Sequence, residues 1–209
     1  MSYSKDVGEV SARCRPGREV PSVTYPSGTH VVFTAPGSAT NGQYGLFEWN
    51  MTRTRGGADP HFHKTFSESF YVMEGTVRLF NGETWIDAVK GDFLYVPQGG
   101  IHAFSNESGA PARMLILFAP GPPREEYFTE LADIRSSGRT MTDEDWIAVW
   151  ARHDQYPALH PASGRRGRQR AAGRVGRWPR NRRAGLYGAK PPLWRRLEIP
   201  GFMPDGGPT

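Results

Sequence analysis

The chain has 209 residues and a formal net charge of +5, and a chain of this length is expected to hold one domain with an extension. It has a single cysteine, Cys14, so it can form no internal disulfide. Residues 1–6 lack the apolar core of a secretory signal, and the longest apolar run, 114–119, is far shorter than the roughly 20 residues that cross a bilayer. These features predict a cytoplasmic protein that does not associate with membranes.

Residues 1–27 form a polar extension that contains proline and shows no helical period of apolar residues. Residues 28–120 then carry short runs rich in β-branched and aromatic residues, separated by glycine, proline and asparagine. Such spacing indicates an all-β barrel or sandwich, with Asn81-Gly82 as the clearest hairpin turn. The predicted strands are 30–34, 44–51, 68–73, 76–80, 84–86, 93–96, 102–105 and 112–118.

Candidate metal ligands gather within this region. His61 and His63 are two residues apart and, in an extended strand, point to one face while Phe62 turns away. Glu68 follows five residues later, and His102 stands at the head of an apolar strand. A set of imidazole and carboxylate donors suits a divalent transition metal better than Ca²⁺ or Mg²⁺.

The pattern around these residues resembles the two motifs of the cupin superfamily, G-x5-H-x-H-x3-4-E-x6-G and G-x5-P-x-G-x2-H-x3-N. The first motif is met, except that only three residues separate its opening glycine from its first histidine, and the second is met without departure. The matching positions are Gly57, His61, His63, Glu68 and Gly75 in the first motif, and Gly91, Pro97, Gly99, His102 and Asn106 in the second.

This resemblance implies a cupin double-stranded β-helix, a jelly-roll-like barrel with a metal inside one end, over residues 28–120. It further implies that His61, His63, Glu68 and His102 are the metal ligands. A single barrel followed by a short helical segment resembles the small bacterial quercetin-2,3-dioxygenase-like cupins. The implied reaction opens the ring of an enolic or flavonol-type substrate, incorporates both atoms of O₂ and releases carbon monoxide, with Glu68 as the catalytic base.

The donor set also describes the chemistry of the site. Three neutral imidazoles and one carboxylate leave a divalent ion with net positive charge and, at coordination number five or six, with positions open to substrate or O₂. Fe, Mn, Ni, Co and Zn all accept such a set, so one divalent transition metal of unspecified identity is predicted. Glu68 either ligates or hangs free as a base, and it alone among the motif residues can take a proton from a substrate hydroxyl.

The substrate pocket is expected to be apolar and partly aromatic, and to suit a planar hydroxylated small molecule. Phe104 lies two positions after His102 and therefore on the same face of a regular strand. The predicted wall residues are Phe66, Tyr95, Phe104, Met114 and Phe118.

Residues 121–160 change to a helical period. A first helix begins after a run of prolines and carries an apolar stripe of Tyr127, Leu131 and Ile134. A second begins at the capping residue Thr142 and carries Trp146, Val149 and Trp150. This pair is predicted either to cover the core or to overhang the barrel mouth.

Residues 161–209 carry eleven arginines and one lysine against two acidic residues, a charge of +10 that leaves −5 for residues 1–160. A segment so poor in aliphatic residues is predicted to be disordered. Arginine-rich tails can neutralise nucleic-acid backbones, but a block of charge without a folded motif is weak evidence for binding. A nucleic-acid partner is therefore not expected, and this tail is the only segment that could bind one.

Two other functions fit the same residues. One is a metal-dependent isomerase or polyketide cyclase that works without O₂, in which the metal acts as a Lewis acid. The other is a non-catalytic cupin that binds a small molecule. In each case the resemblance and the usual symmetry of soluble assemblies predict a homodimer.

Overall fold

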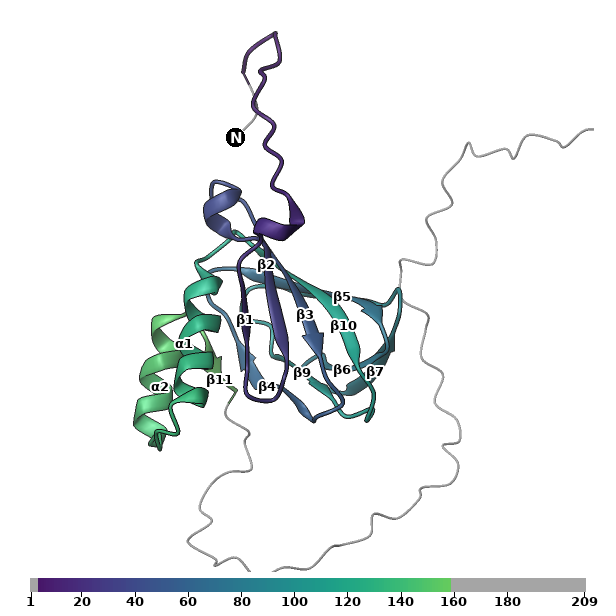
Figure 1. Cartoon of the computed structure of the whole chain (residues 1–209), viewed down its shortest axis with the longest axis vertical. Coiled ribbons are helices and arrows are strands. Elements are labelled where there is room, and N and C mark those ends of the chain that lie inside the picture. The colour runs from purple at the N-terminus through teal and green to yellow at the C-terminus, as the bar shows by residue number, and fades with distance from the viewer. Residues whose placement is uncertain (1–3, 159–209) are drawn as a thin grey trace, which may run out of the picture. The chain divides into compact units, whose positions relative to one another are not determined.

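The computed structural model describes residues 4–158, and these fold into two antiparallel β-sheets with two α-helices (Figure 1). One sheet has the strand order β1-β2-β3-β10-β5-β8, and the other has the order β11-β4-β9-β6-β7. The strands are β1 (Ser22–Thr24), β2 (His30–Ala35), β3 (Gly45–Met51), β4 (Gly56–Phe62), β5 (Ser67–Glu74), β6 (Thr76–Phe80), β7 (Trp85–Val89), β8 (Phe93–Val96), β9 (His102–Asn106), β10 (Ala112–Ala119) and β11 (Tyr156–Pro157). The all-β cupin architecture predicted from the sequence is confirmed.

The core lies between the two sheets because side chains along each strand alternate between buried and partly exposed positions. In β3 and β10, which pair directly, every second residue is buried. Phe47, Phe70 and Met114 from one sheet and Val77 from the other are fully buried, and Phe104 is almost so. This alternation with a period of two is the reason that these segments form half-buried strands.

Two of the motif glycines occupy positions where a side chain would not fit. Gly75 joins β5 to β6 with φ of 73°, a conformation that side chains rarely adopt. Gly57 lies where β4 approaches β9 so closely that a Cβ there would stand 1.9 Å from the carbonyl oxygen of Phe104. Asn106, at the end of β9, donates from its buried amide to the carbonyls of Thr52 and Ala110, at 2.8 and 2.7 Å.

Two helices follow the last long strand. They are α1 (Arg124–Ser136) and α2 (Asp143–Arg152), and short 3-10 turns occupy Gly17–Glu19 and Gly37–Ala39. Thr142 and Asp145 form a capping box at the start of α2, as the sequence predicted. The buried face of α1 includes Tyr127 and Phe128, which belong to the barrel core.

Two short strands were not predicted, and one predicted segment lies outside the described residues. Strands β1 and β11 were not predicted, because three and two residues are too few to show an alternation of apolar and polar residues. The predicted disordered tail, 161–209, lies outside the described residues.

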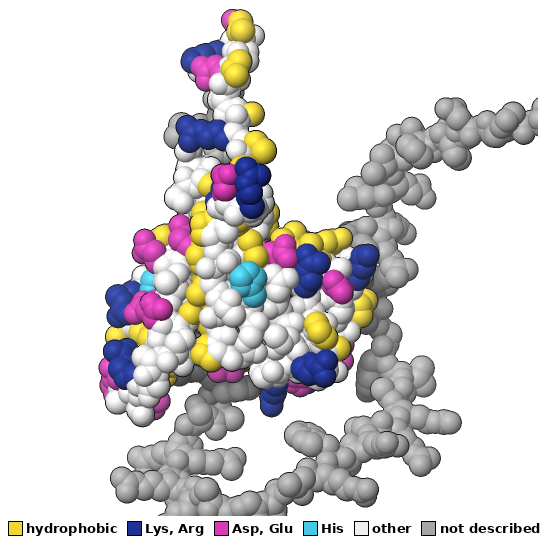
Figure 2. Space-filling view, viewed as in Figure 1, with side chains coloured by type: hydrophobic (Ala, Val, Ile, Leu, Met, Phe, Trp, Pro, Cys, Tyr) yellow, Lys and Arg dark blue, Asp and Glu magenta, His cyan; other side chains and the backbone are white. Residues whose placement is uncertain are grey.

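Within residues 4–158, no helix is both long enough and apolar enough to cross a membrane. Acidic and basic side chains are intermingled on the face drawn in Figure 2.

Candidate metal centre and adjoining cavity

The two paired histidines come from the end of β4. His61 lies on that strand and His63 directly follows it, and their side chains are only 5% and 2% exposed. Phe62, between them, points the other way and stacks on Tyr156 of β11, with ring centroids 5.4 Å apart. The strand geometry expected from the spacing of these residues is therefore confirmed.

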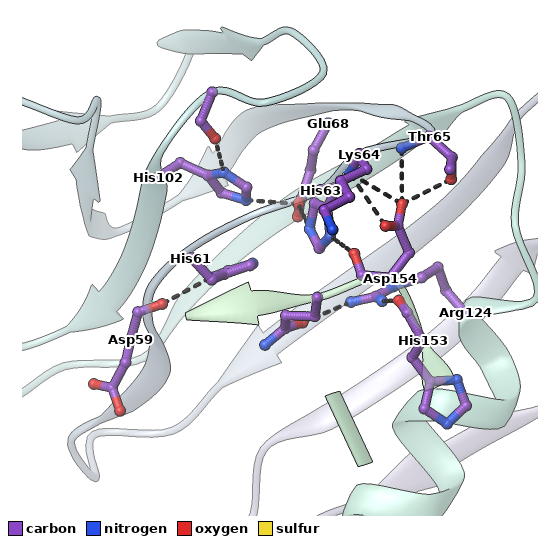
Figure 3. A network of polar contacts seen from close by, with 12 residues as sticks. Asp59, His61, His63, Lys64, Thr65, Glu68, His102, Arg124, His153 and Asp154 are labelled. Carbon is purple, nitrogen blue, oxygen red and sulfur yellow. Dashed lines mark hydrogen bonds and ion pairs between the residues drawn. The ribbon is translucent and has the colours of Figure 1, made fainter. Parts of the chain in front are cut away.

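Glu68, at the start of β5, and His102, at the start of β9, complete the group. The four residues His61, His63, Glu68 and His102 each offer one ligand atom, and these atoms all lie within 4.8 Å of one another (Figure 3). Glu68 Oε2 is 3.0 Å from His63 Nε2 and 2.8 Å from His102 Nε2. All four side chains are buried, so the group forms a buried centre between the two sheets.

Each histidine ring is oriented by a hydrogen bond from its other nitrogen to a main-chain carbonyl. A carbonyl oxygen can only accept, so each Nδ1 carries a proton and each Nε2 is the atom available to a metal. The donors and acceptors are His61 Nδ1 to Asp59 O at 2.7 Å, His63 Nδ1 to Asp154 O at 2.5 Å and His102 Nδ1 to Gly100 O at 3.0 Å. This arrangement of donor atoms fits a divalent transition metal.

The charges of the group are strongly coupled. Burial alone raises the pKa of Glu68, but the charge of His102 and the hydrogen bonds from His102 and His63 outweigh it and hold that pKa well below its usual range. Burial lowers the pKa of His102, but Glu68 raises it overall. Burial, followed by the nearby charge of His102, lowers the pKa of His61 to about 3. A metal ion would have to displace the proton that His102 shares with Glu68.

Asp154 fixes the loop that carries His63. This residue follows α2, and besides its carbonyl bond to His63 its carboxylate accepts from the amides of Lys64 and Thr65 and from the Thr65 hydroxyl, at 2.7 to 3.2 Å. Its φ of 50° is a left-handed conformation that aspartate tolerates better than most residues. This contact was not predicted from the sequence, because about 90 residues separate Asp154 from the loop that follows His63.

A cavity of about 360 Å³ adjoins the four ligand candidates. His61 and Glu68 form part of its wall, and residues of both helices cover it. The two helices therefore do both things that the sequence suggested: they contribute to the core and they lie over the barrel interior. Aromatic rings make up much of the remaining wall, and these come from Tyr25, Trp49, Phe104, Phe118, Tyr127, Phe128, Trp146 and Trp150.

Of the predicted wall residues, Phe104 and Phe118 line this cavity. Phe66 does not, but it stacks on the ring of His63 with centroids 4.3 Å apart. Met114 is fully buried in the core. The prediction for Tyr95 is wrong: on β8 the neighbouring Val96 faces inward, so Tyr95 faces outward and is 58% exposed.

Three buried polar residues of the cavity wall were not predicted from the sequence: Thr29, Arg124 and Gln155. Arg124 begins α1, where a positive charge is unfavourable because the helix dipole is positive at that end. This unfavourable position of a positive charge was the one feature of the sequence that could have marked Arg124 as a functional residue. Gln155 follows the end of α2 and is placed only by the tertiary fold.

A cupin domain family matches residues 50–118, which confirms the resemblance inferred from the motifs. The quercetin 2,3-dioxygenase of Bacillus subtilis (strain 168) is 32% identical to this chain over 73 residues. That alignment covers 35% of this chain and 21% of the enzyme, so the match spans about a fifth of the length of that relative.

Similar solved structures include KdgF from Halomonas sp., with a TM-score of 0.48 and 15% identity, covering 55% of this chain and 99% of that one. They also include the polyketide cyclase RemF from Streptomyces resistomycificus, with a TM-score of 0.44 and 19% identity, covering 56% of this chain and 93% of the cyclase.

Proposed function

Because this chain carries a cupin domain, we propose that it is a metal-dependent oxygenase, similar to quercetin 2,3-dioxygenase, that adds O₂ to an enolic or flavonol-type small molecule. One observation carries the proposal. Three histidines and one glutamate place their ligand atoms within 4.8 Å of one another, and two of these residues line an aromatic cavity. The sequence similarity to the Bacillus enzyme supports the choice of reaction.

The residues of the cavity have separate tasks in this proposal. Trp49 and Phe104, whose ring centroids lie 5.5 Å apart, offer apolar faces against which a planar substrate can pack. Glu68 lies at both the ligand cluster and the cavity, so it can take the proton of a substrate hydroxyl. The helices cover part of the cavity, and reduced contact with water would strengthen electrostatic interactions inside it. A bound divalent metal would supply Lewis acidity and, if redox-active, a route for electrons to O₂.

The direct test is oxygen uptake by protein reconstituted separately with Fe(II), Mn(II), Ni(II), Co(II) and Zn(II), and offered quercetin and a panel of enediols. Uptake is expected with at least one redox-active metal and not with zinc. It should be lost in His61→Ala and retained in His30→Ala, a matched control because His30 contacts Thr24 rather than the ligand cluster.

Absence of uptake from every fully metallated form would contradict the oxygenase proposal for that panel. Turnover of a substrate without O₂ would instead favour the isomerase or cyclase. Tight binding without any change in the ligand after long aerobic incubation would favour a non-catalytic cupin.

We also propose that the protein is a homodimer that uses the outer face of β5 and β8. Tyr71 pairs directly with Phe93 across these strands, and Tyr95 lies two residues further along β8 on the same face. Their side chains are 44%, 64% and 58% exposed, and β8 is the edge of its sheet. Exposed aromatic residues at a sheet edge are typical of an association surface.

Phe93→Asp is therefore expected to convert the dimer to a monomer, because it places a charge in the proposed interface. Light scattering coupled to size-exclusion chromatography measures the mass. Ile147→Asp changes an equally exposed apolar residue on α2 and should leave the mass unchanged. A wild-type monomer at all concentrations would refute the proposal.

A further inference from the structure

Arg124 is a buried cation in the wall of the cavity. It is the first residue of α1, and only 4% of its surface is exposed. Four aromatic rings surround its guanidinium carbon, with centroids between 4.2 and 5.6 Å away; these belong to Phe66, Phe118, Tyr127 and Phe128. Glu68 and His61 line the same cavity as Arg124. Figure 3 shows Arg124 in the same region as the ligand cluster.

The hydrogen bonds of Arg124 are incomplete. A guanidinium has five N–H donors, and here one bond runs to the carbonyl of His153 at 2.9 Å and one to Gln155 Oε1 at 3.2 Å. Its Nε is buried without a partner. Within residues 4–158 no carboxylate forms an ion pair with it. A charge buried in this way is costly, and its position at a helix N-terminus adds to that cost.

The buried charges around the cavity do not balance. Glu68 is the only carboxylate among the buried residues of the described chain. The carboxylate of Asp154 is occupied by Lys64 and Thr65. With a divalent ion on neutral histidines, the ion, Glu68 and Arg124 together carry a charge of +2. Burial of positive charge is costly, and a ligand that carries negative charge would offset that cost.

We infer that Arg124 binds an anionic group of the substrate, and that the substrate is an enolic or catecholic compound bearing a carboxylate. This inference rests on the proposed metal-dependent function and narrows it, since an unsubstituted flavonol has no carboxylate for Arg124. The hydroxyls of such a compound reach the ligand cluster while its carboxylate accepts charge-assisted hydrogen bonds from the guanidinium. The aromatic walls hold the ring between these two polar ends.

The test compares 3,4-dihydroxybenzoate with 3,4-dihydroxybenzamide, which differ only in the charged group. Calorimetric titration of the full chain loaded with Zn(II), with metal content measured independently, should show that the carboxylate binds about 10- to 100-fold more tightly than the amide. Arg124→Met should make the two affinities equal, and Arg124→Lys should keep part of the preference. Arg152→Met is the control outside the cavity wall, because Arg152 lies on α2 and pairs with Glu130, and it should keep all of the preference.

Equal affinities in the wild-type protein, or a preference that survives in Arg124→Met, would overturn the inference. The wild-type comparison decides the question even if Arg124→Met does not fold. Zinc binding needs no reaction with O₂, so this result is independent of oxygen uptake. Failure of every one of the five divalent metals to bind would overturn the proposed function. If zinc alone does not bind, the same two compounds titrated into metal-free protein still test Arg124, whose charge does not depend on the metal.

Discussion

Glu68→Gln is expected to abolish turnover and to weaken metal binding by more than the roughly 10- to 100-fold that loss of a group supporting a metal ligand costs. The side chain keeps its size but loses the negative charge that lies 2.8 Å from His102 and 3.0 Å from His63. It also loses the ability to take a proton from a substrate hydroxyl. Competition with a chelator for Co(II) measures the affinity, and oxygen uptake measures turnover.

Glu74→Gln is the matched control, because Glu74 lies at the other end of the same strand with its side chain 67% exposed. This variant should keep wild-type metal affinity and activity. The assignment of Glu68 would be refuted if Glu68→Gln bound metal and turned over substrate as well as Glu74→Gln does. Circular dichroism of both variants establishes that any loss arises at the site and not from unfolding.

Phe47→Ala is expected to lower the free energy of unfolding by about 3–5 kcal/mol, as is typical when a buried aromatic ring is deleted. Phe47 is fully buried in β3, and its ring meets those of Phe33, Phe118 and Phe128 edge-on with centroids 5.2 to 5.7 Å apart. Since Phe128 belongs to α1, this deletion opens a cavity where the barrel meets its helical cover.

Urea denaturation of the metal-free protein measures this change, with chelator present so that metal binding does not contribute. Ile147→Ala should change the stability by less than about 0.5 kcal/mol, because Ile147 is 53% exposed on α2. A loss below about 1 kcal/mol in Phe47→Ala would show that the ring cluster does not couple the barrel to the helices.

Part of the ligand cluster was predictable from local geometry, because His61 and His63 lie on one face by strand alternation. Glu68 and His102 were assigned to the same site by the resemblance to the two motifs, since 34 residues separate them. The face of β8 was not predictable in this way, because a strand of four apolar residues does not show from its sequence which alternate pair faces inward. In the structure Leu94 and Val96 face the interior, and Phe93 and Tyr95 face outward.

The other cavity residues were not predictable, since they depend on contacts across the chain. Asp154 meets the His63 loop over about 90 residues of sequence, and Arg124 meets the carbonyl of His153 across 29. No local period encodes such contacts. The helices themselves were readable from proline, capping residues and apolar stripes, but the surface that each would cover was not.

The bond between Asp154 and His63 joins the helical cover to the candidate metal centre. Binding free energies are reciprocal, so an ion that bound His63 would favour the docked end of α2 by as much as the docked helix favoured the ion. Trp146 and Trp150 of that helix stack with centroids 5.7 Å apart beside the cavity. We therefore expect metal loading to change the fluorescence of these two indole rings, which a titration of the metal-free protein would detect.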